Sequence, residues 1–205
     1  MLHLVEHPII RERLTQIRST DSDTAAFRHA LHDIARLMCF PVTANLETSV
    51  TEVETPLTKT DGHELIRPIV LVPILRAGAG MMQGFSEILS EASVGYIGLY
   101  RDEKTHQPHR YYCKMPPNLA EADVIMIDPM LATGGSAADA ADELKELGAS
   151  RIHFACLIAA PEGVKVFEER HPDIPVFTAS LDERLNEDAY IVPGLGDAGD
   201  RYFGT

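Results

Sequence analysis

Tryptophan is absent from this chain of 205 residues, and cysteine occurs only at Cys39, Cys113 and Cys156. Three widely separated cysteines form neither a CxxC pair nor a disulfide framework, which suits a reducing compartment. Long apolar runs are also missing, since stretches such as 69–75 are far shorter than the ~18 residues of a membrane-spanning helix. No basic segment followed by an apolar one opens the sequence. We therefore expect a cytoplasmic protein that binds no membrane.

Basic side chains are scarce, with 18 Lys and Arg against 31 Asp and Glu, so the formal net charge is −13. The acidic composition, with a pI of about 5.0, argues against nucleic acid as a partner, because nucleic-acid binding usually needs a basic face. A small anion held by a few local cations is still allowed. The hydrophobic fraction of 45% and the charged fraction of 24% are typical of a folded globular protein. The length fits a single domain over residues 1–205.

The first part of the chain predicts two amphipathic helices. One begins at Pro8, and the second is capped by Ser22 or Asp23 and ended by Pro41. Weak alternation over 46–57 predicts a strand, and Thr60–Gly62 predicts a turn.

Strands and helices alternate from residue 69 onward. Apolar runs predict buried strands at 69–75, 94–100, 124–127, 152–159 and 176–180, with helices near 80–90, near 136–147 and after Pro161. This order indicates an α/β fold with a central, mainly parallel sheet flanked by helices. The polar interval 101–117 predicts a β-hairpin arm with its tip near Gln107 and Pro108. The last fifteen residues, 191–205, are expected to be an anchored, non-helical coil.

Ligands bind beyond the carboxyl ends of strands in such sheets, which directs attention to the loops after residues 75, 100 and 128. In segment 124–136, a buried strand ends at Asp128 and small and hydroxylated residues lead into a helix. Peptide N–H groups at that helix start, with the hydroxyls of Thr133 and Ser136, suit a phosphate monoester. Asp128 would repel the phosphate and is expected to accept hydrogen bonds from sugar hydroxyls. A plain junction capped by Ser136 is the alternative.

Two further loops carry candidate residues. Arg76 follows the strand 69–75, and its guanidinium group suits phosphate oxygens, although an arginine at such a turn, taken alone, is more often a plain surface residue. The GxGxxG pattern at 194–199 follows no convincing strand and leaves too few residues for the helix of a dinucleotide site.

Neither the pair His29 and His32 nor the pair His106 and His109 has a third ligand at metal spacing, so solvent-facing histidines are expected. Residues 182–184 and Asp188 resemble a charged approach to the last loop.

Four blocks, at 72–80, 98–105, 124–136 and 190–203, resemble in this order the uracil phosphoribosyltransferase branch of the type I phosphoribosyltransferase family. The segment Asp-Pro-Met-Leu-Ala-Thr-Gly-Gly-Ser is especially similar to that branch. Pro129 stands where the wider family typically has a second acid, so Asp128 is alone at the ribose.

The resemblance implies a type I phosphoribosyltransferase fold and conversion of uracil and 5-phospho-α-D-ribose 1-diphosphate to UMP and diphosphate, in pyrimidine salvage. It implies that Arg76, Arg101, Asp128 and Asp197 are the catalytic residues. The diphosphate substrate would be bound by these four and by the loop residues Pro129, Met130, Leu131, Ala132, Thr133, Gly134, Gly135 and Ser136. Within a base-binding segment at about 181–205, Ile191, Gly196, Asp197 and Ala198 would bind uracil.

Magnesium is expected to arrive with the diphosphate and to have no direct protein ligand, with Asp197 contacting it through water. The resemblance also implies a homo-oligomer, either dimer or tetramer, and activation by GTP, for which no residue is assigned. Two alternatives stay open at this point. One is a phosphoribosyltransferase of other base specificity, and the other is a nucleotide-sensing regulator that has this fold but no activity.

Overall fold

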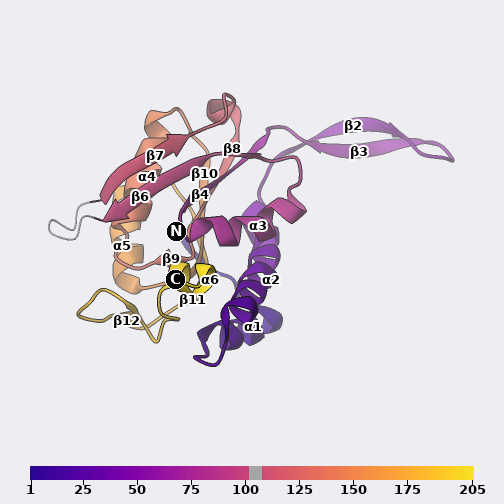
Figure 1. The fold of residues 1–205 in the computed structure, drawn as a ribbon. Coiled ribbons are helices and arrows are strands. Elements are labelled where there is room, and N and C mark those ends of the chain that lie inside the picture. The colour runs from indigo at the N-terminus through magenta and orange to yellow at the C-terminus, as the bar shows by residue number, and fades with distance from the viewer. Residues whose placement is uncertain (102–107) are drawn as a thin grey trace.

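The computed structural model describes the backbone of residues 1–101 and 108–205 and the side chains of residues 1–99 and 111–205. Its centre is a mainly parallel sheet in the order β1–β11–β10–β8–β4–β6–β7 (Figure 1). Neighbouring strands from β1 to β6 are parallel, and only β7 runs antiparallel to its neighbour. The strands are β1 (Leu2–Leu4), β4 (Ile69–Leu75), β6 (Tyr96–Arg101), β7 (Pro108–Lys114), β8 (Asp123–Ile127), β10 (Ile152–Ala159) and β11 (Val176–Leu181). The predicted α/β fold is confirmed.

Helices cover both faces of this sheet (Figure 1). On one face lie α1 (Pro8–Arg18), α2 (Thr24–Thr43) and α3 (Gly78–Ile88), and on the other lie α4 (Gly135–Glu146) and α5 (Pro161–Arg170). Successive side chains of a strand point to opposite faces of the sheet. In β4, Ile69 and Leu71 pack with the first group of helices, and Val70 and Val72 pack with the second. Both faces are therefore apolar, which explains the uninterrupted apolar runs of the sequence.

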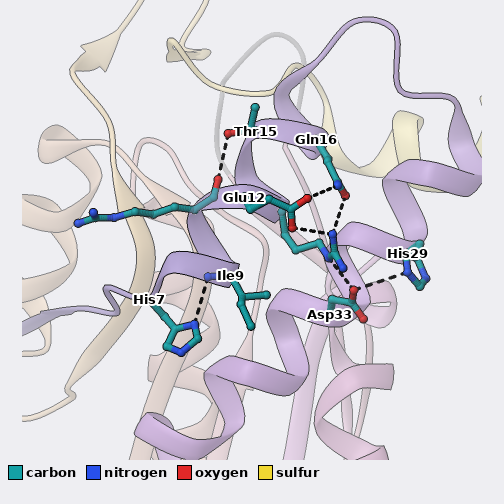
Figure 2. Close-up of polar contacts among 9 residues, drawn as sticks. His7, Ile9, Glu12, Thr15, Gln16, His29 and Asp33 are labelled. Carbon is teal, nitrogen blue, oxygen red and sulfur yellow. Dashed lines mark hydrogen bonds and ion pairs between the residues drawn. The ribbon is translucent and has the colours of Figure 1, made fainter.

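The N-terminal helices form a pair joined by polar side chains. Pro8 occupies the first turn of α1, as predicted, and the Asp23 side chain caps α2 by accepting a hydrogen bond from the Ala26 N–H at 2.8 Å. Asp33 of α2 accepts a hydrogen bond from Nε of Arg13 in α1 at 2.7 Å and lies beside His29 (Figure 2). The prediction that Pro41 ends α2 is wrong. The helix continues to Thr43, whose hydroxyl donates to the Cys39 carbonyl oxygen at 2.7 Å and stabilises this last turn.

A hairpin of β2 (Thr48–Glu54) and β3 (Lys59–Leu65) projects from the body of the molecule (Figure 1). The turn predicted at Thr60–Gly62 is wrong, because these residues lie inside β3. The chain turns instead at Thr55–Thr58, where the Thr55 hydroxyl oxygen accepts the N–H groups of Leu57 and Thr58. This local hydrogen bonding outweighs the turn preference of Asp61-Gly62.

The predicted arm is present as the antiparallel pair β6 and β7, while residues 102–107, including Lys104, His106 and Gln107, lie outside the described part of the chain. The expectation of a non-helical C-terminus is wrong, because α6 (Ala198–Phe203) is a short helix there. Its start is capped by Asp197, which accepts the Asp200 N–H at 2.8 Å. Shorter elements are β5 (Ser93–Val94), a 3-10 turn (Leu119–Glu121), β9 (Met130–Leu131), β12 (Arg184–Leu185) and β13 (Ile191–Val192). Among the described residues no helix is both long and apolar enough to cross a membrane.

Candidate active site

A cleft of about 340 Å³ lies at the carboxyl ends of β4 and β8, next to the C-terminal segment. Four parts of the chain contribute to its lining: residues 74–77 after β4, Leu99 of β6, residues within 128–136 after β8, and residues within 189–199. A smaller pocket of about 180 Å³ shares Asp128, Met130, Ala132, Ser136 and Ala189 with the cleft and continues along Thr133 and Gly134. Residues from all four sequence blocks therefore meet in one place.

The loop between β8 and α4 ends at a helix start without a side-chain cap. Gly134 occupies the N-cap position with φ of +84°, and the described part of the chain supplies no side-chain cap hydrogen bond to this helix. A Cβ atom at this position would come within 2.6 Å of the Gly163 carbonyl oxygen, so only glycine fits the turn. Ser136 is therefore not the cap, and it lines both pockets instead. Open N–H groups at a helix N-terminus suit an anion.

Asp128 lies at the junction of the two pockets. Burial raises the pKa of its carboxyl group to about 7, the N–H of Met130 at 3.4 Å lowers the pKa in part, and the negative charge of Asp197 raises it again. At neutral pH the group is therefore divided between its protonated and ionised forms. It can donate or accept a hydrogen bond, and a bound sugar offers hydroxyls for both.

Arg76 extends from the end of β4 toward the C-terminal helix. Its Nη2 donates to Asp200 Oδ1 at 3.3 Å, and its guanidinium carbon lies 5.7 Å from the centre of the Phe203 ring. The side chain stays 60% exposed at the cleft, so it is accessible to an anionic ligand. Nothing in the local sequence links Arg76 to α6; this partnership comes only from the fold.

The C-terminal segment closes the other side of the cleft. Ile191 lies in β13, which pairs antiparallel with β12, and Gly196, Asp197 and Ala198 follow at the start of α6. Because Asp197 caps α6 while lining the cleft, its carboxylate has one oxygen engaged with the helix. Within the described residues no group of three or more His, Cys, Asp or Glu side chains is placed to hold a metal ion.

Residues 4–205 match the family model described as uracil phosphoribosyltransferase. The chain belongs to the uracil phosphoribosyltransferase family. It is 53% identical over 205 residues to the uracil phosphoribosyltransferase of Malacoplasma penetrans, with all of both chains covered. Among solved structures it is similar to the AQ2163 protein of Aquifex aeolicus, with a TM-score of 0.94, 34% identity and coverage of 100% of this chain and 99% of that one.

The fold is shared more widely. An adenine phosphoribosyltransferase of Trypanosoma brucei matches with a TM-score of 0.61 at 13% identity, covering 96% of this chain and 88% of that one. At this identity the likeness shows the type I phosphoribosyltransferase fold alone.

Most of the predicted site residues of this uracil phosphoribosyltransferase family member line the two pockets. The larger one is lined by Arg76, Asp128, Met130, Ala132, Ser136, Ile191, Gly196, Asp197 and Ala198, and the smaller one adds Leu131, Thr133 and Gly134. Pro129 is not in either lining; its carbonyl oxygen accepts the N–H groups of Leu157 and Ile158 and ties the loop to β10. Gly135 is the first residue of α4. The side chain of Arg101 lies outside the described part.

Some site residues were missed by the sequence reasoning. Ala189 and Tyr190 line the cleft, with Ala189 at a φ of +62° and the Tyr190 N–H bonded to the Asn186 side chain at 2.8 Å. Tyr190 is the first residue of the block 190–203 but was not singled out as a site residue, and no motif indicated Ala189, although Asn186 before the turn is a local signal. Asp182, which was interpreted as part of a charged approach to the last loop, has a buried side chain that is ion-paired with Arg18 and accepts the Gly194 N–H of that loop.

The histidine predictions have mixed outcomes. His29 is exposed as expected, but His32 is partly buried and lies 3.0 Å from a carboxylate oxygen of Glu87. The side chains of His106 and His109 lie outside the described residues.

Proposed function

We propose that this protein transfers the phosphoribosyl group of 5-phospho-α-D-ribose 1-diphosphate to uracil, forming UMP and diphosphate. The observation that carries the proposal is the convergence of three loops on one cleft: a phosphate-type helix start, an arginine, and a glycine-rich C-terminal loop. Membership of the uracil phosphoribosyltransferase family supports the choice of substrates.

The loop after β8 is proposed to bind the 5′-phosphate and ribose. The uncapped N–H groups of α4 and the hydroxyls of Thr133 and Ser136 would hold the phosphate, and Asp128 would meet the ribose hydroxyls. Binding energy gained at these groups, away from the anomeric carbon, orients that carbon for attack by uracil N1.

The C-terminal loop is proposed to select the base through peptide groups. Uracil presents two carbonyl acceptors on either side of the N3–H donor, and the backbone of Ile191, Gly196 and Ala198 can offer the complementary pattern. These residues share the cleft with Arg76 and Asp128, which places the base beside the ribose in this arrangement. Cytosine has an amino donor at C4 and an acceptor at N3, in place of the O4 acceptor and N3–H donor of uracil, so it would leave the matching peptide groups unpaired.

Departure of diphosphate is proposed to be stabilised by cations. Arg76 and Arg101 would bind the diphosphate oxygens as negative charge develops on them. Magnesium would enter as part of the substrate complex, and the carboxylate of Asp197 in the cleft suits contact with its water shell. No described side chain in the cleft is placed as a clear general base for uracil N1, so leaving-group stabilisation carries the reaction in this proposal.

The decisive experiment supplies the diphosphate substrate and Mg²⁺ with uracil, cytosine, hypoxanthine or adenine, each with and without GTP. UMP from uracil alone is the expected result. Formation of a nucleotide from hypoxanthine or adenine would show that the enzyme acts on a purine and would contradict uracil as the base. No product from folded protein that still binds the diphosphate substrate would instead favour a non-catalytic regulator with this fold. A rate that depends on GTP would establish the activation implied by the family resemblance.

The role of Arg101 is tested by Arg101→Ala. If Arg101 binds the leaving diphosphate mainly in the transition state, kcat falls by about 10²-fold or more while the affinity for uracil changes little. The matched control is Arg11→Ala, because Arg11 is an exposed arginine of α1 that forms an ion pair with Glu6 and lies outside the cleft lining. Equal fractional losses in kcat and in uracil affinity would contradict the role.

We also propose that the chain forms a homo-oligomer through the β2–β3 hairpin. A two-stranded hairpin is marginal in water on its own, yet this one exposes Val50 (66%), Val53 (42%) and Leu57 (95%). A second copy of the chain would cover these side chains.

A further inference from the structure

Arg18, the last residue of α1, reaches the segment that leads into the proposed base site. Its Nη2 donates to Asp182 Oδ1 at 2.6 Å, and its Nη1 donates to Asp182 Oδ2 at 2.7 Å. The same guanidinium group also donates to the Gly194 carbonyl oxygen at 2.8 Å and to the Ser180 hydroxyl at 3.0 Å. Four bonds from one planar group fix its orientation. We call this arrangement the Arg18–Asp182 clamp.

Asp182 is enclosed, with 2% of its side chain exposed. It accepts hydrogen bonds from the Ser180 hydroxyl at 2.7 Å and from the Gly194 N–H at 2.9 Å, in addition to those from Arg18. Burial by itself would raise the pKa of Asp182, but the hydrogen bonds from Arg18, Ser180 and Gly194 lower it below its ordinary value. The carboxylate therefore stays ionised at neutral pH.

Gly194 is held from both sides by this pair. Asp182 accepts its N–H and Arg18 donates to its carbonyl oxygen. The residue has φ of +63°, and a Cβ there would lie 2.0 Å from the Ile191 carbonyl oxygen. Gly194 thus sits in a tight turn between Ile191 and Gly196, which both line the cleft. Fixing its two peptide groups fixes the separation and orientation of the backbone on either side.

We infer that Arg18 and Asp182 are positioning residues for the nucleobase, acting through Gly194 on the peptide groups of Ile191, Gly196 and Ala198. Neither residue lines the cleft, so neither touches substrate there. The inference rests on the proposed base site and extends it: a pair outside the cleft sets the spacing of the hydrogen-bonding groups that read the base. Every peptide group other than that of proline offers the same N–H donor and C=O acceptor. Selectivity for a base therefore depends on the positions in which the backbone holds these groups.

The alternative is that the clamp only stabilises the fold, and α1 offers a matched control for this. Arg13 lies on the same helix, is 25% exposed against 23% for Arg18, and pairs with Asp33 at 2.7 Å. That contact joins α1 to α2 and involves no residue of the cleft. Arg13→Met therefore removes a comparable ion pair without touching the C-terminal loop.

The experiment compares steady-state kinetics and melting temperatures of the wild type, Arg18→Met, Arg18→Lys, Ser180→Ala and Arg13→Met. Arg18→Met is expected to raise KM for uracil about tenfold or more, with KM for the diphosphate substrate within about twofold of the wild type. Arg18→Lys keeps the positive charge but loses the forked donor group, so its KM for uracil should lie between those of the wild type and Arg18→Met. Arg13→Met is expected to lower the melting temperature and leave both KM values unchanged.

A double-mutant cycle with Asp182→Asn tests whether the pair acts as one unit. The double variant Arg18→Met and Asp182→Asn is expected to raise KM for uracil no more than the worse single variant. Independent, additive effects would contradict a shared action through Gly194.

Three results would overturn the inference: unchanged KM for uracil, a parallel rise in both KM values, or the same rise in Arg13→Met. If Arg18→Met fails to fold, the milder Arg18→Lys and Ser180→Ala decide the matter, and unchanged KM for uracil in both overturns it. A wild type that makes no UMP would instead refute the proposed function, so the two failures are distinguishable.

Discussion

Asp128 shows how position changes the chemistry of a side chain. The sequence places an acid at the end of a buried strand, and from this its contact with ribose hydroxyls was inferred. Its pKa of about 7 arises from burial and from the charge of Asp197, which is far away in the sequence. Cys156 has its pKa raised to about 12, first by burial and also by the charge of Asp128, so it stays a neutral thiol. The residue type was predictable, but its protonation state depends on the fold.

Replacing Asp128 with Asn is expected to stabilise the protein at pH 8 and to have little effect near pH 4. The folded-state pKa lies above the unfolded value of about 3.9, so the ionised carboxylate destabilises the fold increasingly as pH rises from about 4 to 7. Asn removes this penalty, on the order of 1–3 kcal/mol, and should raise the melting temperature at pH 8 by roughly 3–8 °C. Thermal unfolding at both pH values measures it.

Activity should move the opposite way in the same variant, because Asn cannot offer a carboxylate to the ribose. Asp61→Asn is the control, since Asp61 is an exposed residue of β3. A variant that melts below the wild type at pH 8 would show that Asp128 does not carry a buried charge in the free protein.

At the scale of single elements, the predictions that succeeded depend on local pattern. The apolar run 152–159 coincides with β10, and Pro8 and Asp23 mark the helix starts as expected. Two elements that the sequence did not predict depend on distant contacts. The strand β1 has three residues and exists through its pairing with β11. The helix α6 is held by Arg201, which donates to the carbonyl oxygens of Ile17 and Ser19. Periodicity contains no information about such partners.

The candidate site divides in the same way. The strand–acid–loop–helix order of 124–136 is a local pattern, and the structure places most of that loop at the pockets. The bonding of Asp182 with Arg18, by contrast, joins residues 164 positions apart, and no spacing rule relates them.

The β2–β3 hairpin carries a prediction about assembly. Val50→Glu and Leu57→Glu together place charges where exposed apolar side chains would meet a second copy, so the protein is expected to shift toward monomer. Light scattering coupled to size-exclusion chromatography measures the mass. The control is Val166→Glu on α5, an apolar residue of 42% exposure away from the hairpin. An assembly that survives the double change, or is equally disrupted by Val166→Glu, would contradict the role of the hairpin.

For the whole molecule, charge predicts that stability is highest on the acidic side of neutrality. Lowering the pH from 8 toward the pI of about 5.0 reduces the self-repulsion of a chain with formal charge −13 and removes the cost of ionised Asp128. Below the unfolded pKa of about 3.9, stability falls again. Asp182 and Asp173 have lowered pKa values in the fold, and the stability that they contribute is lost as they become protonated.

The expected melting temperature therefore passes through a maximum between about pH 4.5 and 6. Thermal unfolding from pH 3.5 to 8.5 in matched ionic strength tests this. A melting temperature that rises steadily to pH 8 would contradict the balance of charges described here.

The contacts between the first helices and the last residues also bear on how the protein is made. Arg18 is synthesised well before its partner Asp182. Ile17, whose carbonyl oxygen accepts a hydrogen bond from Arg201, precedes that residue by 184 positions. At ordinary rates of synthesis this delay is roughly 10–30 s. A nascent chain that has already produced all of β4, β8 and α4 still lacks the cover of its cleft. The nascent enzyme is therefore expected to be inactive until residues 189–199, which complete the cleft, have left the ribosome.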